Sequence, residues 1–91
     1  MDFKAACESA ELVADHNNIN LDSHPECVRE VLIEMVFQLG VGGVSKFKKF
    51  LAHLSTGTYH LAADEMLDSR WAKQTPQRAE KLSYIIRSLS H

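Results

Sequence analysis

Ninety-one residues, of which 45% are hydrophobic, can bury one core but are too few for two lobes with a deep cleft between them. We therefore expect residues 1–91 to form a single domain. Ten basic and twelve acidic side chains, interspersed along the chain, give a formal net charge of −2, which argues against binding to nucleic acid or to an anionic membrane. No apolar stretch has the length of a signal peptide or of a membrane span, so we expect neither.

The first predicted helix covers residues 3–15. The asparagines that follow, Asn17, Asn18 and Asn20, tolerate left-handed conformations and compete for backbone hydrogen bonds, so the helix should end before them. A connection then runs to about Asp22. The apolar residues of this helix recur mainly at the three- and four-residue intervals of one helix face; they are Phe3, Ala6, Cys7, Ala10, Leu12, Val13 and Ala14.

The second predicted helix should be the most buried one. Ser23 stands three residues before Glu26, which is the spacing of a capping box, and the proline between them is harmless near the first turn. Gly40 should end this helix, and Gly42 with Gly43 should form a tight corner. Two adjacent apolar rows at four-residue spacing predict a wide buried face; they are Cys27, Val31, Met35 and Leu39, and Val28, Leu32 and Val36.

Three more helices are predicted after this corner. Gly57 should stop the first of them, Thr58 should cap the second, and Thr75 before a proline should open the last. No alternating strand pattern of useful length competes, so we predict an all-α, compact single-domain bundle of five to six helices. The residues that these three helices should bury are Phe47, Phe50, Leu51 and Leu54; Leu61, Ala62, Met66 and Leu67; and Ala79, Leu82, Ile85, Ile86 and Leu89.

Few side chains suggest chemistry of their own. Cys7 and Cys27 occupy apolar helix positions outside any spaced cysteine framework, so we expect buried, reduced thiols. His60 and Asp64 stand four residues apart, but no third ligand falls at a supportive spacing. We therefore predict no metal site and no cofactor.

Four segments, taken in order, carry a resemblance. Residues 28–29 read VR, residues 33–40 read IEMVFQLG, residues 43–47 read GVSKF, and residues 69–79 read SRWAKQTPQRA. This order resembles the helical C-terminal lobe of phage-type lysozymes. The resemblance implies a lysozyme-like helical fold that spans most of the chain.

The catalytic lobe of that family has no counterpart in the pattern of this sequence. The family draws a catalytic Glu, Asp and Thr from a lobe built around a β-sheet, whereas the first forty residues here predict two helices without hairpin glycines. Glycoside hydrolysis needs two carboxylates roughly 5 to 9.5 Å apart. Glu11 with Glu8 or Asp15 could reach that separation, but a convex helix surface should offer no cleft. The resemblance therefore implies that the chain alone is not an enzyme.

The resemblance also implies candidate binding residues. In the family, the glutamine of the Phe-Gln pair and the tryptophan of the Arg-Trp pair lie at the cleft and approach the peptide part of peptidoglycan. They correspond here to Gln38 and Trp71, and Arg70 could pair with a ligand carboxylate. The alternative is structural: Trp71 anchors the core and Gln38 is a helix-surface residue bonded to it.

Three functions follow from the resemblance. The chain could be a non-catalytic module that binds another protein of host or phage, which we favour. It could instead be a peptidoglycan-binding remnant, or the helical half of a split muramidase that needs a separately encoded catalytic lobe. Each would place it in the cytoplasm of an infected bacterium or in the virion.

Overall fold

A computed structural model describes residues 2–89, which contain six α-helices, one 3₁₀ turn and no strand. The prediction of an all-α bundle of five to six helices is confirmed. Their bounds are α1 Phe3–His16, the 3₁₀ turn η1 Leu21–Ser23, α2 Glu26–Ser45, α3 Lys48–Ser55, α4 Tyr59–Leu67, α5 Arg70–Gln74 and α6 Pro76–Arg87.

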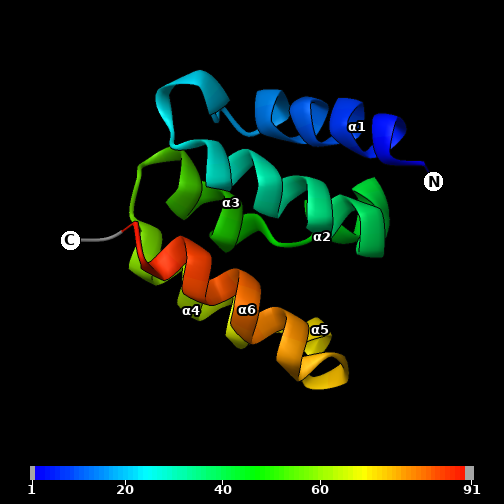
Figure 1. Ribbon diagram of the computed structural model, residues 1–91. Coiled ribbons are helices and arrows are strands. Elements are labelled where there is room, and N and C mark those ends of the chain that lie inside the picture. Colours follow the sequence, from blue (N-terminus) through cyan, green and yellow to red (C-terminus); the bar gives the residue numbers. More distant parts are fainter. Residues whose placement is uncertain (1, 90–91) are drawn as a thin grey trace.

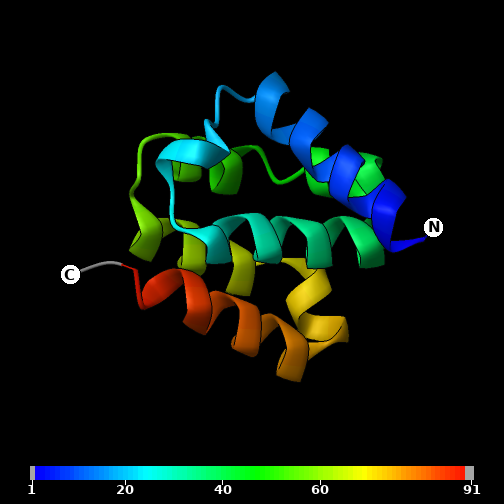
Figure 2. The ribbon, with the colours of Figure 1, turned by 45° about the horizontal axis from the view of Figure 1, so that its top comes forward.

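Helix α2 runs through the middle of the bundle. Helix α1 packs along one side of it and α6 along another, and both run antiparallel to α2 (Figures 1 and 2). Helices α3 and α4 pack against each other, and α4 packs against α6. The N-terminal end of α1 therefore lies near the C-terminal end of α2 in both views.

Helix α1 begins and ends close to the predicted residues. The carboxylate of Asp2 accepts a hydrogen bond from the Ala5 backbone N–H at 2.7 Å, which caps the first turn. At the other end Asn18 takes a left-handed φ of 60°, and the Asn17 side chain donates to the Val13 carbonyl at 2.8 Å. The two asparagines thus supply hydrogen-bond donors to carbonyl groups at the end of the helix that would otherwise have no partner.

The predicted capping box at the start of α2 is wrong. The Ser23 hydroxyl donates to the Asn20 carbonyl at 2.8 Å, because residues 21–23 form their own 3₁₀ turn. Pro25 occupies the N-cap position without a side-chain cap. The helix therefore starts directly after this proline. Proline suits a helix start because its φ is fixed and it has no backbone N–H that would need a partner.

The predicted helix end at Gly40 is confirmed as a break in the helical backbone, although a second helical segment follows at once. Gly40 takes φ 76° and ψ 169°, which is not a helical conformation, so α2 consists of two helical segments that meet at a kink, and the second segment ends at Ser45. Glycine permits this positive φ at no steric cost, so the first helical segment ends there and the chain changes direction. The expected corner at Gly42 and Gly43 is instead a short helical segment.

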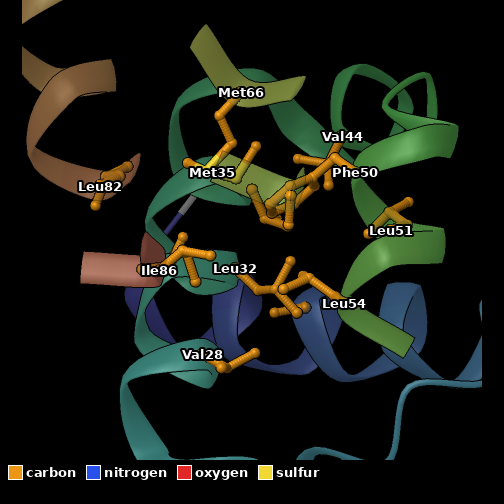
Figure 3. Packing of buried hydrophobic residues seen from close by; sticks show 14 of the residues in the cluster. Val28, Leu32, Met35, Val44, Phe50, Leu51, Leu54, Met66, Leu82 and Ile86 are labelled. Atoms are coloured by element: carbon orange, nitrogen blue, oxygen red, sulfur yellow. The ribbon is translucent and has the colours of Figure 1, made fainter. Parts of the chain in front are cut away.

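The core forms around the buried face of α2, as the apolar rows predicted. Figure 3 shows Leu32 and Met35 of α2 facing Phe50 and Leu54 of α3. Ile86 reaches the same cluster from α6. All five side chains are at most 1% exposed.

Helix α4 buries a different set from the one predicted. Ala62, Ala63 and Met66 are buried, whereas Leu61 and Leu67 are each 39% exposed. The buried face of α4 thus combines two alanines, which let neighbouring helices approach closely, with the larger Met66.

The expected threonine caps do not form side-chain cap bonds. The hydroxyl of Thr58 lies 2.9 Å from that of Thr56, and the hydroxyl of Thr75 donates to the Trp71 carbonyl at 3.0 Å. Glycine does stop α3 as predicted, because Gly57 takes a φ of 74°.

Both cysteines are free, but neither is fully buried. Cys7 is half-buried against the core and Cys27 is half-buried at the start of α2, so the expectation of buried thiols is only partly met. Among residues 2–89 no helix combines the length and apolar character needed to cross a membrane.

Candidate functional site

Gln38 and Trp71 lie 33 residues apart in sequence and meet in the fold. Gln38 lies two residues before the kink of α2, and Trp71 lies in the first turn of α5. The indole N–H donates to Gln38 Oε1 at 3.3 Å. The Phe47 ring packs edge-on against the indole, with centroids 6.2 Å apart.

The short helix α5 holds Trp71 in place. The Ser69 hydroxyl accepts a hydrogen bond from the Ala72 N–H at 3.2 Å and donates its own hydrogen to the Met66 carbonyl at 2.7 Å. These bonds join the end of α4 to the start of α5. The indole is consequently only 6% exposed.

This geometry leaves one unused polar group at the pair. The Nε2 of Gln38 is buried and has no hydrogen-bond acceptor among the described residues. An unsatisfied buried donor costs roughly 1 to 3 kcal/mol. A carbonyl oxygen that reached this atom would remove the cost, but the indole face and N–H are already occupied.

Arg70 does not join this pair. It is the first residue of α5 and is exposed, with no ion pair or hydrogen bond to its side chain among residues 2–89. The role that the resemblance implies for Arg70, as a partner of a ligand carboxylate, stays a prediction.

A second polar cluster, which sequence analysis missed, surrounds Arg29 of α2. Its guanidinium donates to Glu11 Oε1 at 2.7 Å and to Asp22 Oδ1 at 3.3 Å. Its Nε lies 3.7 Å from Glu26 Oε1. The cluster thus ties α1, η1 and the first turn of α2 together.

The expectation of a convex surface around Glu11 is wrong, because residues 18–22 fold back beside α1. They enclose an open hollow of about 480 Å³ together with Glu11, Asp15 and Arg29. The acidic side chains here are still poorly suited to general acid catalysis, which depends on apolar, buried surroundings. The side chain of Asp22 is 91% exposed and that of Glu11 is 56% exposed.

A third cluster joins Tyr59, at the start of α4, to His24. The Nδ1 of His24 lies 2.6 Å from the Tyr59 hydroxyl, and the two rings pack edge-on. Burial raises the pKa of Tyr59 above its ordinary value, and the nearby Cys27 raises it further. The contact fastens α4 to the segment that precedes α2.

Several large apolar side chains remain exposed outside these clusters. Phe37 on α2 is 52% exposed, although it lies next to Gln38 in the otherwise most buried helix. In the sequence, Phe37 lies outside both apolar rows of this helix, and this position indicates that its side chain is exposed. The others are Phe3, Leu12, Val41, Leu61, Leu67 and Tyr84.

Comparison with known proteins identifies relatives of part of the chain. "Probable T4-type lysozyme 2" of Dictyostelium discoideum is 41% identical over 63 residues, which are 69% of this chain and 35% of that protein. The pre-baseplate central spike protein Gp5 of Enterobacteria phage T4 is 41% identical over 59 residues, which are 64% of this chain and 10% of Gp5. "Probable T4-type lysozyme 1" of Dictyostelium discoideum is 40% identical over 55 residues, which are 60% of this chain and 32% of that protein.

The chain thus spans about a third or less of the length of these relatives. No family model and no solved structure matches it. The predicted resemblance is nevertheless confirmed: the chain corresponds to a fragment of a lysozyme-like domain and is related to proteins of phage.

Proposed function

We propose that this lysozyme-like fragment is a non-catalytic module that binds another protein, of the host or of a phage. The observation that carries the proposal is the contrast between two aromatic side chains. Trp71 is only 6% exposed, whereas Phe37 is 52% exposed on the central helix. An aromatic ring in water on a well-packed helix suits an interface, where such rings contribute much of the binding energy.

The absence of catalysis is proposed from the carboxylates of the described residues. Glu11 and Asp22 both bind Arg29, and neither is shielded from water. Glycosidases place one carboxylic acid in apolar surroundings so that it stays protonated near neutral pH. Residues 2–89 provide no such surroundings in the hollow around Arg29.

Peptidoglycan binding is the alternative, and the unused Nε2 of Gln38 favours it. An amide donor of this kind could bind a peptide carbonyl of the cell wall. It is the weaker candidate because Trp71 is covered by Phe47 and its N–H is taken by Gln38. Little of a flexible ligand would be desolvated there, so its ordering cost would not be offset.

Restored muramidase activity is a third candidate, and the relatives support it. Two of them are named as lysozymes, and this chain covers only about a third of each. A separately encoded catalytic lobe could dock on the exposed apolar surface that includes Phe37. All three functions would act in the cytoplasm of an infected bacterium or in the virion.

A two-arm pull-down tests the proposal. The purified chain is the bait, and the arms are insoluble peptidoglycan and a soluble lysate of the bacterial host. We expect a stoichiometric protein in the lysate arm that Phe37→Ser abolishes. Leu12→Ser is the matched control, because Leu12 is 58% exposed on the outer face of α1, and it should retain the protein.

The first alternative would show itself in the same experiment, and the second needs a separate lysis assay. Sedimentation with peptidoglycan that Gln38→Ala removes, without capture of a protein, would contradict the proposal in favour of wall binding. If adding a separately expressed lysozyme catalytic lobe produced lytic activity, the non-catalytic proposal would be wrong.

A further inference from the structure

A groove of about 340 Å³ separates α2 from α6. Its floor is apolar and consists of Val31, Leu82 and Ile85, the first two being buried and the third half-buried. Helices α2 and α6 run antiparallel (Figure 2), and the groove lies between residues 30–34 of α2 and residues 78–85 of α6. The groove is thus straight and has an apolar floor.

The two rims of the groove carry opposite charge. Glu30 and Glu34, one turn apart on α2, form the acidic rim, and Arg78 and Lys81, three residues apart on α6, form the basic rim. All four side chains are exposed. Negative charge therefore lies on the α2 rim of the groove and positive charge on the α6 rim.

These four side chains form no ion pair with one another. Within residues 2–89 the ion pairs involve Arg29 and Arg87, and none includes Glu30, Glu34, Arg78 or Lys81. Carboxylates and cations thus face each other across the groove more than 4 Å apart. An occupant with both signs of charge could pair with both rims at once.

We propose that the α2/α6 groove docks an amphipathic helix of the protein partner, with acidic residues flanking the basic rim and basic residues flanking the acidic rim. This inference rests on the proposed protein-binding function and names the kind of partner. Along α6, Arg78 and Ile85 are seven residues apart, which is two turns or about 10.5 Å. A docked helix with apolar anchors at i, i+3 or i+4, and i+7 matches that length.

The exposed face of α2 extends the same footprint. Phe37 follows Glu30 by seven residues and Glu34 by three, so the three share one stripe of the helix. A helix longer than the groove would reach the Phe37 ring beyond the acidic rim. The Phe37 ring thus stands on the same stripe of α2 as the acidic rim, outside the lining of the groove.

Other classes of ligand fit the groove less well. The two glutamates repel an anionic membrane or nucleic acid. No aromatic ring lines the groove to stack on a sugar. A helix that offers both signs of charge is the occupant that both rims attract.

Synthetic helical peptides of about 18 residues test the proposal directly, since that length supports a helix. All share one leucine face at i, i+4 and i+7. The mixed peptide has glutamates on one flank and lysines on the other, and two further peptides have only glutamates or only lysines on both flanks. We expect the full chain to bind the mixed peptide about tenfold more tightly than either of the others.

A charge reversal then identifies the groove as the site. In the double variant Arg78→Glu/Lys81→Glu both rims are acidic, so the mixed peptide should lose about tenfold in affinity and the all-lysine peptide should gain about as much. Lys48→Glu/Lys49→Glu is the matched control, because these exposed lysines of α3 lie outside the groove, and it should change neither affinity. Circular dichroism confirms that each variant is folded.

Three results would overturn the inference. Equal affinity for all three peptides would do so, as would a mixed peptide that binds the double variant unchanged. A dimer of the chain alone, seen by sedimentation and dissociated by the double variant, would make the groove a contact between copies. If Phe37→Ser abolished capture from the lysate while the peptides failed to discriminate, the proposed function would stand and only the groove assignment would fall.

Discussion

Gly42 and Gly43 are neighbours in the same helical segment, yet alanine should change the stability of the protein in opposite directions at the two positions. A Cβ atom added at Gly42 would meet no atom within 4 Å. A Cβ atom added at Gly43 would lie 2.8 Å from the Cβ of Leu39. The kink at Gly40 causes this closeness, because it tilts the segment after it toward the preceding turn.

The expected magnitudes follow from two opposing effects. Replacing glycine by alanine at a compatible backbone position reduces the freedom of the unfolded chain and stabilises a protein by about 0.4 to 1 kcal/mol. Gly42→Ala should gain that amount. At Gly43 the same gain is opposed by overpacking, which costs typically 1 to 3 kcal/mol, so Gly43→Ala should be destabilising by about 1 kcal/mol.

Urea unfolding followed by circular dichroism measures both changes. A difference of about 2 kcal/mol between the variants separates their unfolding midpoints by on the order of 1 M urea. Gly40→Ala is a useful third variant, since its φ of 76° should cost alanine about 1 to 2 kcal/mol without any close contact. If Gly42→Ala and Gly43→Ala stabilised the protein equally, the packing of Leu39 against the kinked segment would be refuted.

Other predictions test the core, the candidate site and the titratable tyrosine. Met35→Ala should lower the free energy of unfolding by about 2 to 5 kcal/mol, because Met35 is 0% exposed. Phe37→Ala should change it by less than about 0.5 kcal/mol. Equal losses for the two variants in a denaturation series would contradict the assigned face of α2. Trp71→Ala should cost about 3 to 5 kcal/mol, and a variant of unchanged stability would show that the indole is not a core anchor. The pKa of Tyr59 is raised from 10.0 by burial and by Cys27, so the folded state holds the phenolic proton more tightly than the unfolded state. The resulting stability is present below about pH 10 and is lost as the pH rises through the raised pKa of Tyr59. This alkaline loss should be absent in Tyr59→Phe. If thermal melts gave the same pH profile for this variant and the unaltered protein, Tyr59 would not be the cause of the loss.

The sequence predicted the helices that strong local signals define. Asn17 and Asn18 ended α1 because their side chains and backbone tolerance act within a few residues. The four-residue apolar rows of α2 predicted its buried face, since a helix of regular pitch places such residues on one side. Local signals of this kind depend little on the rest of the fold.

The same local rules failed where a different nearby partner or a neighbouring helix decided the outcome. Ser23 has the spacing of a capping box but bonds to Asn20, because the preceding 3₁₀ turn presents that carbonyl first. Leu61 and Leu67 have apolar side chains but stay 39% exposed, because α3 and α6 contact the face that holds Ala62, Ala63 and Met66. The local pattern of α4 did not show which of its faces the neighbouring helices would cover.

For the candidate site, the sequence determined the residue types and the relationship to lysozymes, and the tertiary structure decided which groups are available. The resemblance pointed to Gln38 and Trp71, and the fold brought them within 3.3 Å. The indole of Trp71 is covered only because Phe47 and α5 pack around it. Glu34 and Arg78 lie on opposite rims of one groove only because α2 and α6 pack side by side in antiparallel directions. Exposure and charge complementarity arise from segments that are distant in sequence, so they become defined only when the chain has folded.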